Sequence, residues 1–157
     1  MALDVGEARI GVAVCDAREI IASPYTTLHV TRDETQTFAA IQRLIAETEA
    51  EGLVVGLPIS MDGQIHGQGK WVQEFVEHLK PHISLPLTFW DERLSTVEAR
   101  RLLNQDDTWD IGRTRQRRTT RRQSKRRVHT QEIDAYAAAV ILQDYLDSRG
   151  RNVEGTT

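Results

Sequence analysis

The chain has 157 residues, a single cysteine, Cys15, and no long apolar run. One cysteine cannot close an intramolecular disulfide, so the fold must depend on its hydrophobic core. No stretch approaches the roughly 18 consecutive apolar residues of a transmembrane helix, and residues 1–9 lack the apolar segment of a secretory signal. With 39% hydrophobic residues, a chain of this length can bury one core. These absences predict a cytoplasmic protein of one domain that contacts no membrane.

Two common ligand motifs are also missing. The five histidines have no cysteine or acidic partner at the spacing of a zinc site. Residues 61–70 form a glycine-rich stretch after an apolar run, where ligand-facing loops of α/β sheets occur. It is not a Walker A loop, because five residues separate Gly63 from Gly69 and Trp71 replaces the required hydroxyl residue. His66 in this stretch could still meet a substrate.

Residues 113–127 contain neither an acidic nor an apolar residue. This arginine tract carries nine positive charges, so the rest of the chain has a net charge of −12. Without apolar side chains to pack, we expect a mobile loop and not a folded element. Arginine binds phosphate through its bidentate fork, so contact with a polyanion is the favoured role and a solvated insertion is the alternative. The predicted nucleic-acid-binding residues of the tract are Arg113, Arg115, Arg117, Arg118, Arg121, Arg122, Lys125, Arg126 and Arg127.

The rest of the chain alternates between strand and helix patterns. Short apolar runs predict strands at 2–5, 10–15, 20–30, 53–58 and 85–90, the first three as an antiparallel meander. Helical spacing of apolar residues follows within 31–52, 71–79, 95–103 and 133–146. We expect Thr130 to cap the last helix, with a buried stripe of Ile133, Ala137, Val140, Ile141 and Tyr145. This order predicts an α/β fold.

Acidic residues lie at the ends of three of these elements. Asp4 ends the first apolar run before a glycine turn, Asp91 and Glu92 close the run 85–90, and Asp134 opens the last helix. Carboxylate oxygens are the ligands that Mg²⁺ and Mn²⁺ prefer. Three carboxylates on three core elements therefore predict a metal site.

Four ordered motifs resemble the YqgF family, also called RuvX. They occupy residues 3–6 with 9–13, 54–58 with 61–63, 91–99, and 133–135 with 137–142, so the resemblance covers about residues 2–147. It implies an RNase H-like fold related to Holliday-junction resolvases, with a mixed five-stranded sheet flanked by helices. It also implies a nuclease that processes the 5′ end of pre-16S rRNA during ribosome biogenesis.

The resemblance implies a nuclease domain at 1–148, with an arginine-rich insertion at about 105–129, followed by a flexible tail at 149–157.

Two features depart from the family pattern. The insertion is longer and richer in arginine than the short basic loop of the family. The chain also begins only three residues before Asp4, which suggests a late start codon or a trimmed edge and a weakly anchored first strand.

By resemblance, Asp4, Glu92 and Asp134 form the catalytic and metal-binding set, with Asp4 bridging two Mg²⁺ or Mn²⁺ ions. Such a pair of ions can neutralise the phosphate, activate a water and stabilise the leaving oxygen. Because neighbours in a strand point to opposite faces, only one of Asp91 and Glu92 can face the site, and we favour Glu92. Arg9 and Arg93 follow metal-side acids, where they would pair with them or contact a phosphate.

Two alternative functions stay open at this point. A Holliday-junction resolvase would share the chemistry but cut branched DNA, usually as a symmetric dimer. A non-catalytic RNA-binding assembly or transcription factor would use the arginine tract and leave the acids structural. We favour pre-ribosomal RNA as the partner of a monomer or homodimer, while the cleavage position and the endonucleolytic or exonucleolytic mode stay open.

Overall fold

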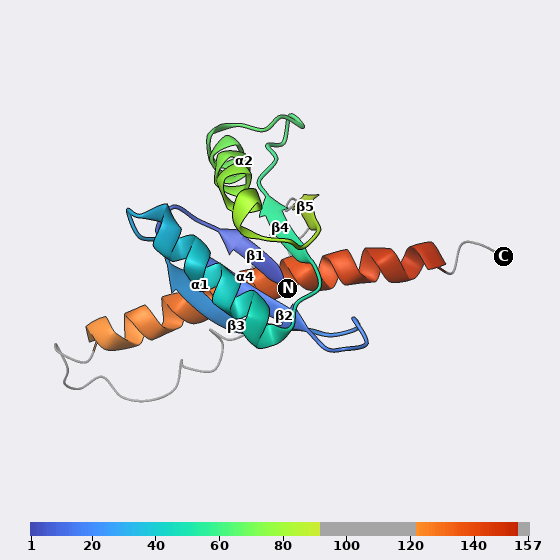
Figure 1. The fold of residues 1–157 in the computed structure, drawn as a ribbon, viewed down its shortest axis with the longest axis horizontal. Coiled ribbons are helices and arrows are strands. Elements are labelled where there is room, and N and C mark those ends of the chain that lie inside the picture. The colour runs from blue at the N-terminus through green and yellow to red at the C-terminus, as the bar shows by residue number, and fades with distance from the viewer. Residues whose placement is uncertain (92–121, 154–157) are drawn as a thin grey trace, which may run out of the picture.

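The computed structural model describes residues 1–91 and 122–153, and a five-stranded sheet forms its centre (Figure 1). The strands are β1 (Ala2–Val5), β2 (Arg9–Cys15), β3 (Ala22–His29), β4 (Leu53–Leu57) and β5 (Leu87–Asp91). They lie in the order β3-β2-β1-β4-β5. β2 is antiparallel to both β1 and β3, whereas β4 is parallel to both β1 and β5. The mixed sheet expected from the sequence is confirmed, with β1 at its centre.

Helices cover both faces of the sheet (Figure 1). Helices α1 (Glu34–Thr48) and α2 (Gly67–Leu79) pack on one face, and the short 3-10 helix η1 (Lys80–His82) follows α2. The long helix α4 (Arg122–Val153) packs on the other face against residues of β1, β2 and β4. In the described part of the chain, no helix is both long and apolar enough to span a membrane. The expected helix at 95–103 lies outside the described residues.

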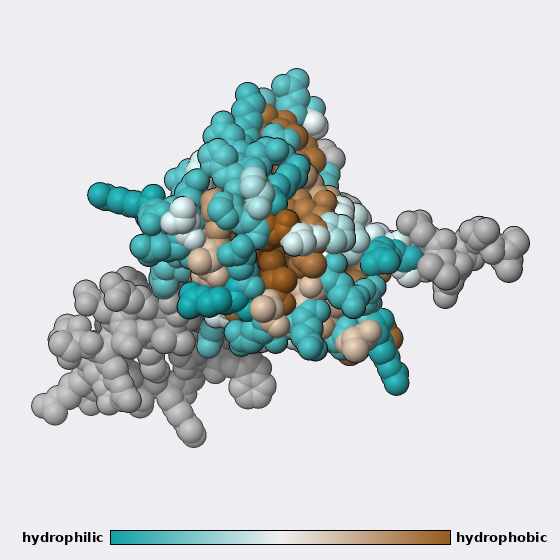
Figure 2. Space-filling view, in the orientation of Figure 1, coloured by the Kyte–Doolittle hydropathy of each residue, from teal (hydrophilic) through white to brown (hydrophobic). Residues whose placement is uncertain are grey.

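Two hydrophobic cores reflect these two layers. The larger core joins the sheet to α1 and α2, where the rings of Phe38 and Phe75 meet edge to face at 5.4 Å. The smaller core joins the sheet to α4, and half of its buried residues are alanines: Ala2, Ala13, Ala138 and Ala139. Figure 2 shows hydrophobic residues gathered in the middle of one face, with hydrophilic residues around them. Because alanines have little bulk, α4 can lie closer to the sheet than a helix with large side chains could.

The beginning of α4 corrects two expectations from the sequence. The helix begins at Arg122 and not at a Thr130 cap, so residues 122–127 of the arginine tract are helical. The prediction of a loop there was wrong because arginine, lysine and glutamine are good helix formers even where they bury nothing. Once the packed part of α4 provides a nucleus, each added residue gains a backbone hydrogen bond. The part of the tract before residue 122 lies outside the described residues.

The buried stripe of α4 also differs from the expected one. Of the predicted positions, Ile141 is buried, whereas Ile133, Ala137, Val140 and Tyr145 are only partly buried. The fully covered positions are Ala135, Ala138, Ala139, Ile141, Leu142 and Leu146. An alanine-rich helix offers several apolar stripes, and the stripe with the smaller side chains lies against the sheet. The same helix continues through residues 149–153, and the domain limits at 148 stay a prediction.

Candidate active site

Asp4 lies on the face of the sheet that α4 covers. Strand side chains alternate between faces, and Leu3 and Val5 belong to the core beneath α1 and α2, whereas Ala2 belongs to the core beneath α4. Asp4 therefore shares the α4 face with Ala2. In the antiparallel pairing of β1 with β2, Asp4 lies opposite Gly11.

Gly11 explains how α4 reaches the sheet at this point. A Cβ atom built on Gly11 would lie 1.9 Å from the backbone oxygen of Asp134 and 2.4 Å from its carbonyl carbon. No side chain fits in that space, so the backbone of α4 passes directly over β2. Asp134 consequently lies beside the strand position that pairs with Asp4.

Arg9 completes the described part of this cluster. Its Nε donates a hydrogen bond of 2.5 Å to Oδ2 of Asp134, and the two side chains are 37% and 23% exposed. Arg9 precedes Gly11 by two residues on β2, so both share the α4 face. The sheet and α4 are thus joined by an ion pair at the edge where β1 ends.

The electrostatics of Asp4 favour a bound cation. Burial, and after it the negative charge of Asp134, together raise the pKa of Asp4 from 3.8 to about 6. Among the described residues, no group donates a hydrogen bond to its carboxylate. A partly buried carboxylate with no donor and an acidic neighbour is costly unless a cation neutralises it. The carboxylates of Asp4 and Asp134 therefore suit a hard divalent ion such as Mg²⁺ or Mn²⁺.

The end of β5 bears on the choice between Asp91 and Glu92, for which the sequence favours Glu92. Leu87 and Phe89 pack against the core beneath α1 and α2, and Trp90 packs against the core beneath α4. By alternation, Asp91 belongs to the face of α1 and α2, opposite to Asp4 and Asp134. Glu92 and Arg93 themselves lie outside the described residues, and so do Arg113, Arg115, Arg117, Arg118 and Arg121.

Trp90 and Gly11 are site-supporting residues that the sequence reasoning did not find. Trp90 donates from Nε1 to Oδ2 of Asp144 over 2.8 Å, and its ring meets that of Tyr145 edge to face at 5.5 Å. These contacts hold the end of β5 against α4. A signal for Gly11 was present, because a glycine inside a strand pattern often marks close approach of another backbone. No comparable signal linked Trp90 to Asp144, which are 54 residues apart.

Within the described residues, no group of three or more His, Cys, Asp or Glu side chains is placed to hold a metal. The structure brings together Asp4, Asp134 and Arg9, and the predicted third acid is not among the residues it describes. Arg122, Lys125, Arg126 and Arg127 lie in the first turns of α4, between two and four turns before Asp134. The second part of the basic tract, residues 122–127, therefore belongs to the same helix as Asp134.

The glycine-rich stretch at 61–70 lies at the same edge of the sheet as Asp4. It follows β4, which is parallel to β1, and Gln68 donates from Nε2 to the backbone oxygen of Val5 over 3.4 Å. Within the stretch, His66 and Asp62 form a pair with 2.8 Å between Nε2 and Oδ2. Helix α2 begins within this stretch, at Gly67. A ligand-facing role of the stretch and a substrate contact of His66 stay predictions.

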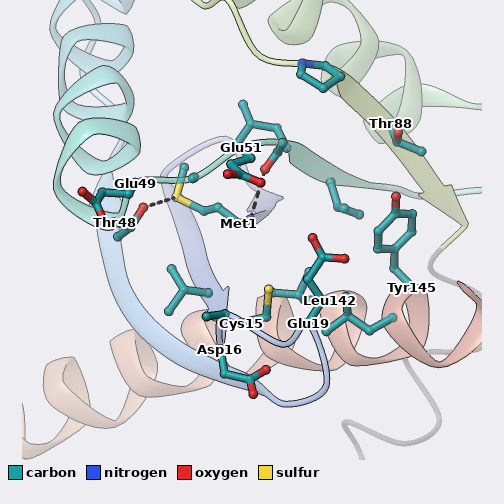
Figure 3. Close-up of a pocket in the computed structure, with 18 of the residues that line it drawn as sticks. Met1, Cys15, Asp16, Glu19, Thr48, Glu49, Glu51, Thr88, Leu142 and Tyr145 are labelled. Carbon is teal, nitrogen blue, oxygen red and sulfur yellow. Dashed lines mark hydrogen bonds between the residues drawn. The ribbon is translucent and has the colours of Figure 1, made fainter. Parts of the chain in front are cut away.

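A cavity of about 580 Å³ lies at the opposite edge of the sheet (Figure 3). Figure 3 shows Met1, Cys15 and Glu19 around it, together with Tyr145 of α4. Residues at the starts of β1, β4 and β5 line it, whereas Asp4 lies at the end of β1, and neither Asp4 nor Asp134 is among the lining residues. The chemistry therefore points to the carboxylate cluster and not to this cavity.

Comparisons with known proteins identify the family of the chain. A family model described as "RuvX: Holliday junction resolvase" matches residues 1–148. Two proteins named "Putative pre-16S rRNA nuclease", from Roseiflexus sp. (strain RS-1) and Thermoanaerobacter pseudethanolicus, are 42% and 41% identical over 149 residues. Both matches cover 95% of this chain, and they cover 94% and 96% of the two relatives.

A solved structure supports the fold. The RuvC protein of T. thermophilus, solved in complex with a Holliday junction substrate, matches with a TM-score of 0.52 and 12% identity, over 95% of this chain and 93% of that chain. This likeness confirms the predicted RNase H-like α/β fold. The nuclease class predicted from the sequence agrees with the names of the relatives. With the family model spanning nearly the whole chain, the protein belongs to the RuvX family.

Proposed function

We propose that this protein is a metal-dependent nuclease that processes the 5′ end of pre-16S rRNA in the cytoplasm. The observation that carries the proposal is the pair of Asp4 and Asp134 on one face of the sheet, where the pKa of Asp4 is raised and no described residue donates a hydrogen bond to Asp4. The names of the relatives from Roseiflexus and Thermoanaerobacter support the class of substrate.

In this proposal, Asp4, Asp134 and Glu92 hold one or two Mg²⁺ or Mn²⁺ ions. When bound, divalent ions supply charge neutralisation at the phosphate and activation of a water. The chain's own contribution is the placement of the ligands. Gly11 lets Asp134 approach Asp4, the alternation of side chains along β5 favours Glu92 over Asp91, and the Arg9 hydrogen bond joins Asp134 to the start of β2.

The basic residues around the site would hold the substrate. Arg9, Arg93 and the arginine tract can donate to phosphates, and helical arginines and lysine at 122–127 extend this positive charge along α4. Contacts to non-scissile phosphates raise affinity and fix the register of the strand without reading its sequence. The same surface suits RNA or DNA, so the substrate must be decided by experiment.

Cleavage of branched DNA is a second candidate, because the matching family model is described as a Holliday junction resolvase. A labelled pre-16S rRNA 5′ leader and a labelled four-way DNA junction should be incubated with the protein in Mg²⁺, in Mn²⁺ and in EDTA. We expect metal-dependent cleavage of the RNA. Cleavage of the junction alone, by a protein that sediments as a dimer, would favour the resolvase. Binding of RNA without cleavage in either metal would favour the non-catalytic assembly factor.

A further inference from the structure

Arg9 has one partner in the described part of the chain, and that partner is a proposed metal ligand. Its Nε donates to Oδ2 of Asp134, and among the side chains that the structure describes, at 1–91 and 132–150, the N–H groups on its two terminal nitrogens meet no acceptor. The side chain is 37% exposed, so solvent and a large substrate can reach it. A guanidinium has five N–H donors in a planar fork, and one of them is used here.

The two acids of the cluster differ in how their charge is balanced. Asp134 has the guanidinium of Arg9 as a counter-cation, whereas Asp4 has no hydrogen-bond donor among the described residues. A divalent ion placed between the two carboxylates would be repelled by the positive charge of Arg9, which is already bound to Asp134. Cations that compete for one carboxylate destabilise each other, because neither is fully paired when both are present.

We propose that Arg9 is an exchangeable counter-cation: it neutralises Asp134 while no divalent ion is bound, and it turns to a phosphate of the nucleic acid once an ion occupies the carboxylates. The inference rests on the proposed function, since it needs a metal at Asp4 and Asp134. Arginine suits both partners, because its fork matches a carboxylate and a phosphate equally well. The exchange would make metal binding strengthen nucleic-acid binding, and by linkage the reverse.

The first test measures Mn²⁺ binding by isothermal titration calorimetry without nucleic acid. Arg9→Gln removes the competing charge, so we expect the first Mn²⁺ to bind roughly tenfold more tightly than in the wild type. Arg9→Lys keeps the charge and should bind Mn²⁺ within about threefold of the wild type. The matched control is Arg149→Gln, which breaks another arginine–carboxylate pair, Arg149 with Glu19, beside the cavity at the opposite edge of the sheet. Urea unfolding of each variant verifies that it folds.

The second test measures binding of a labelled RNA oligonucleotide by fluorescence anisotropy, in EDTA and in Ca²⁺, with intact RNA verified on a gel. In the wild type, Arg9 reaches a phosphate only with the ion bound, so the slope of log K against log salt should be steeper in Ca²⁺ than in EDTA. This steepening should exceed the one measured for Arg9→Gln by about 0.7. Arg149→Gln should behave as the wild type in this comparison.

The outcomes separate this inference from the proposed function. A wild type that binds no Mn²⁺ would overturn both. Normal Mn²⁺ binding by the wild type, with unchanged or weaker binding by folded Arg9→Gln, would overturn only the exchange and leave Arg9 as a permanent support of Asp134. Tighter Mn²⁺ binding by Arg9→Gln with no loss of the Ca²⁺-dependent slope would also overturn it, because Arg9 would then leave Asp134 without meeting a phosphate.

Discussion

The backbone oxygen of Asp134 lies so close to Gly11 that a single methyl group on that glycine would overlap it at 1.9 Å. Gly11 in turn lies opposite Asp4 in the pairing of β1 with β2. One position without a side chain therefore determines how near the two described acids of the site can come. This relationship leads to the first of five predictions.

Gly11→Ala should separate α4 from the sheet. Because the overlap is with backbone atoms, no side-chain rotation can relieve it, and we expect a loss of stability of about 1–3 kcal/mol in urea unfolding. The affinity for Mn²⁺ should fall by more than the stability loss explains. The matched control is Gly150→Ala on α4, where the added Cβ meets nothing within 4 Å and alanine favours the helix. Equal stability of both variants would contradict the close approach.

Asp4→Asn should abolish cleavage while the fold and nucleic-acid binding survive, because the amide cannot supply the negative charge that a divalent ion needs. We expect the cleavage rate to fall by orders of magnitude in single-turnover assays. A well-folded Asp4→Asn protein that cleaves at the wild-type rate would remove the metal proposal.

The same substitution has a pH-dependent effect on stability. Because the pKa of Asp4 is raised from 3.8 to about 6, the native state binds more protons than the unfolded state between these values, and the free energy of unfolding falls as pH rises. Above pH 6, the ionised carboxylate of Asp4 lowers the free energy of unfolding by at most about 3 kcal/mol. In EDTA, Asp4→Asn should therefore be more stable than the wild type at pH 7 but not at pH 4, as measured by urea unfolding at both values.

An acid with the opposite shift provides the control for that measurement. The His66 hydrogen bond lowers the pKa of exposed Asp62, so its contribution is present above its unfolded pKa and lost as pH falls. Asp62→Asn should leave the protein no more stable than the wild type at pH 7. If both variants gained stability at pH 7, the effect would be one of net charge and not of the burial of Asp4.

Glu92→Gln and Asp91→Asn should differ sharply in cleavage rate. Asp91 belongs to the sheet face opposite to Asp4, so we expect Glu92→Gln to be the more damaging by at least about tenfold in single-turnover rate. Mn²⁺ affinity should follow the same order. The reverse order would place Asp91 in the site, and small, equal effects would mean that neither acid binds metal.

The arginine tract should govern affinity more than rate. Changing Arg117, Arg118, Arg121 and Arg122 to Gln removes up to four phosphate contacts, so the slope of log K against log salt should flatten by about 3 units if all four touch phosphate. Single-turnover cleavage at saturating protein should change little. The control removes four exposed cations elsewhere, Arg18, Arg43, Lys80 and Arg149, and should flatten the slope much less. An unchanged slope in the tract variant would mean that the tract is a solvated insertion without phosphate contacts. A collapse of the single-turnover cleavage rate at saturating protein would mean that these arginines stabilise the transition state.

Local pattern was enough to predict most of the fold. The five strands, the helices after β3 and β4, and the last helix follow from alternation, helical spacing and glycine turns, which depend on neighbours within a few residues. The beginning of α4 was missed for the same reason. The polar segment at 122–127 has no core of its own, and its helix depends on propagation from the packed residues after it.

The sequence by itself was enough to predict which residues bring charge to the site: Asp4, Asp134 and Glu92, with Arg9 and Arg93 beside them. Only the tertiary structure decided how these charges are paired. The bond between Arg9 and Asp134 spans 125 residues, and that between Trp90 and Asp144 spans 54. The stripe of α4 that faces the sheet was likewise chosen by Gly11 and by the small alanines of the core. Such contacts depend on how closely two backbones can approach, and that distance is set by packing across the sheet and not by any local pattern.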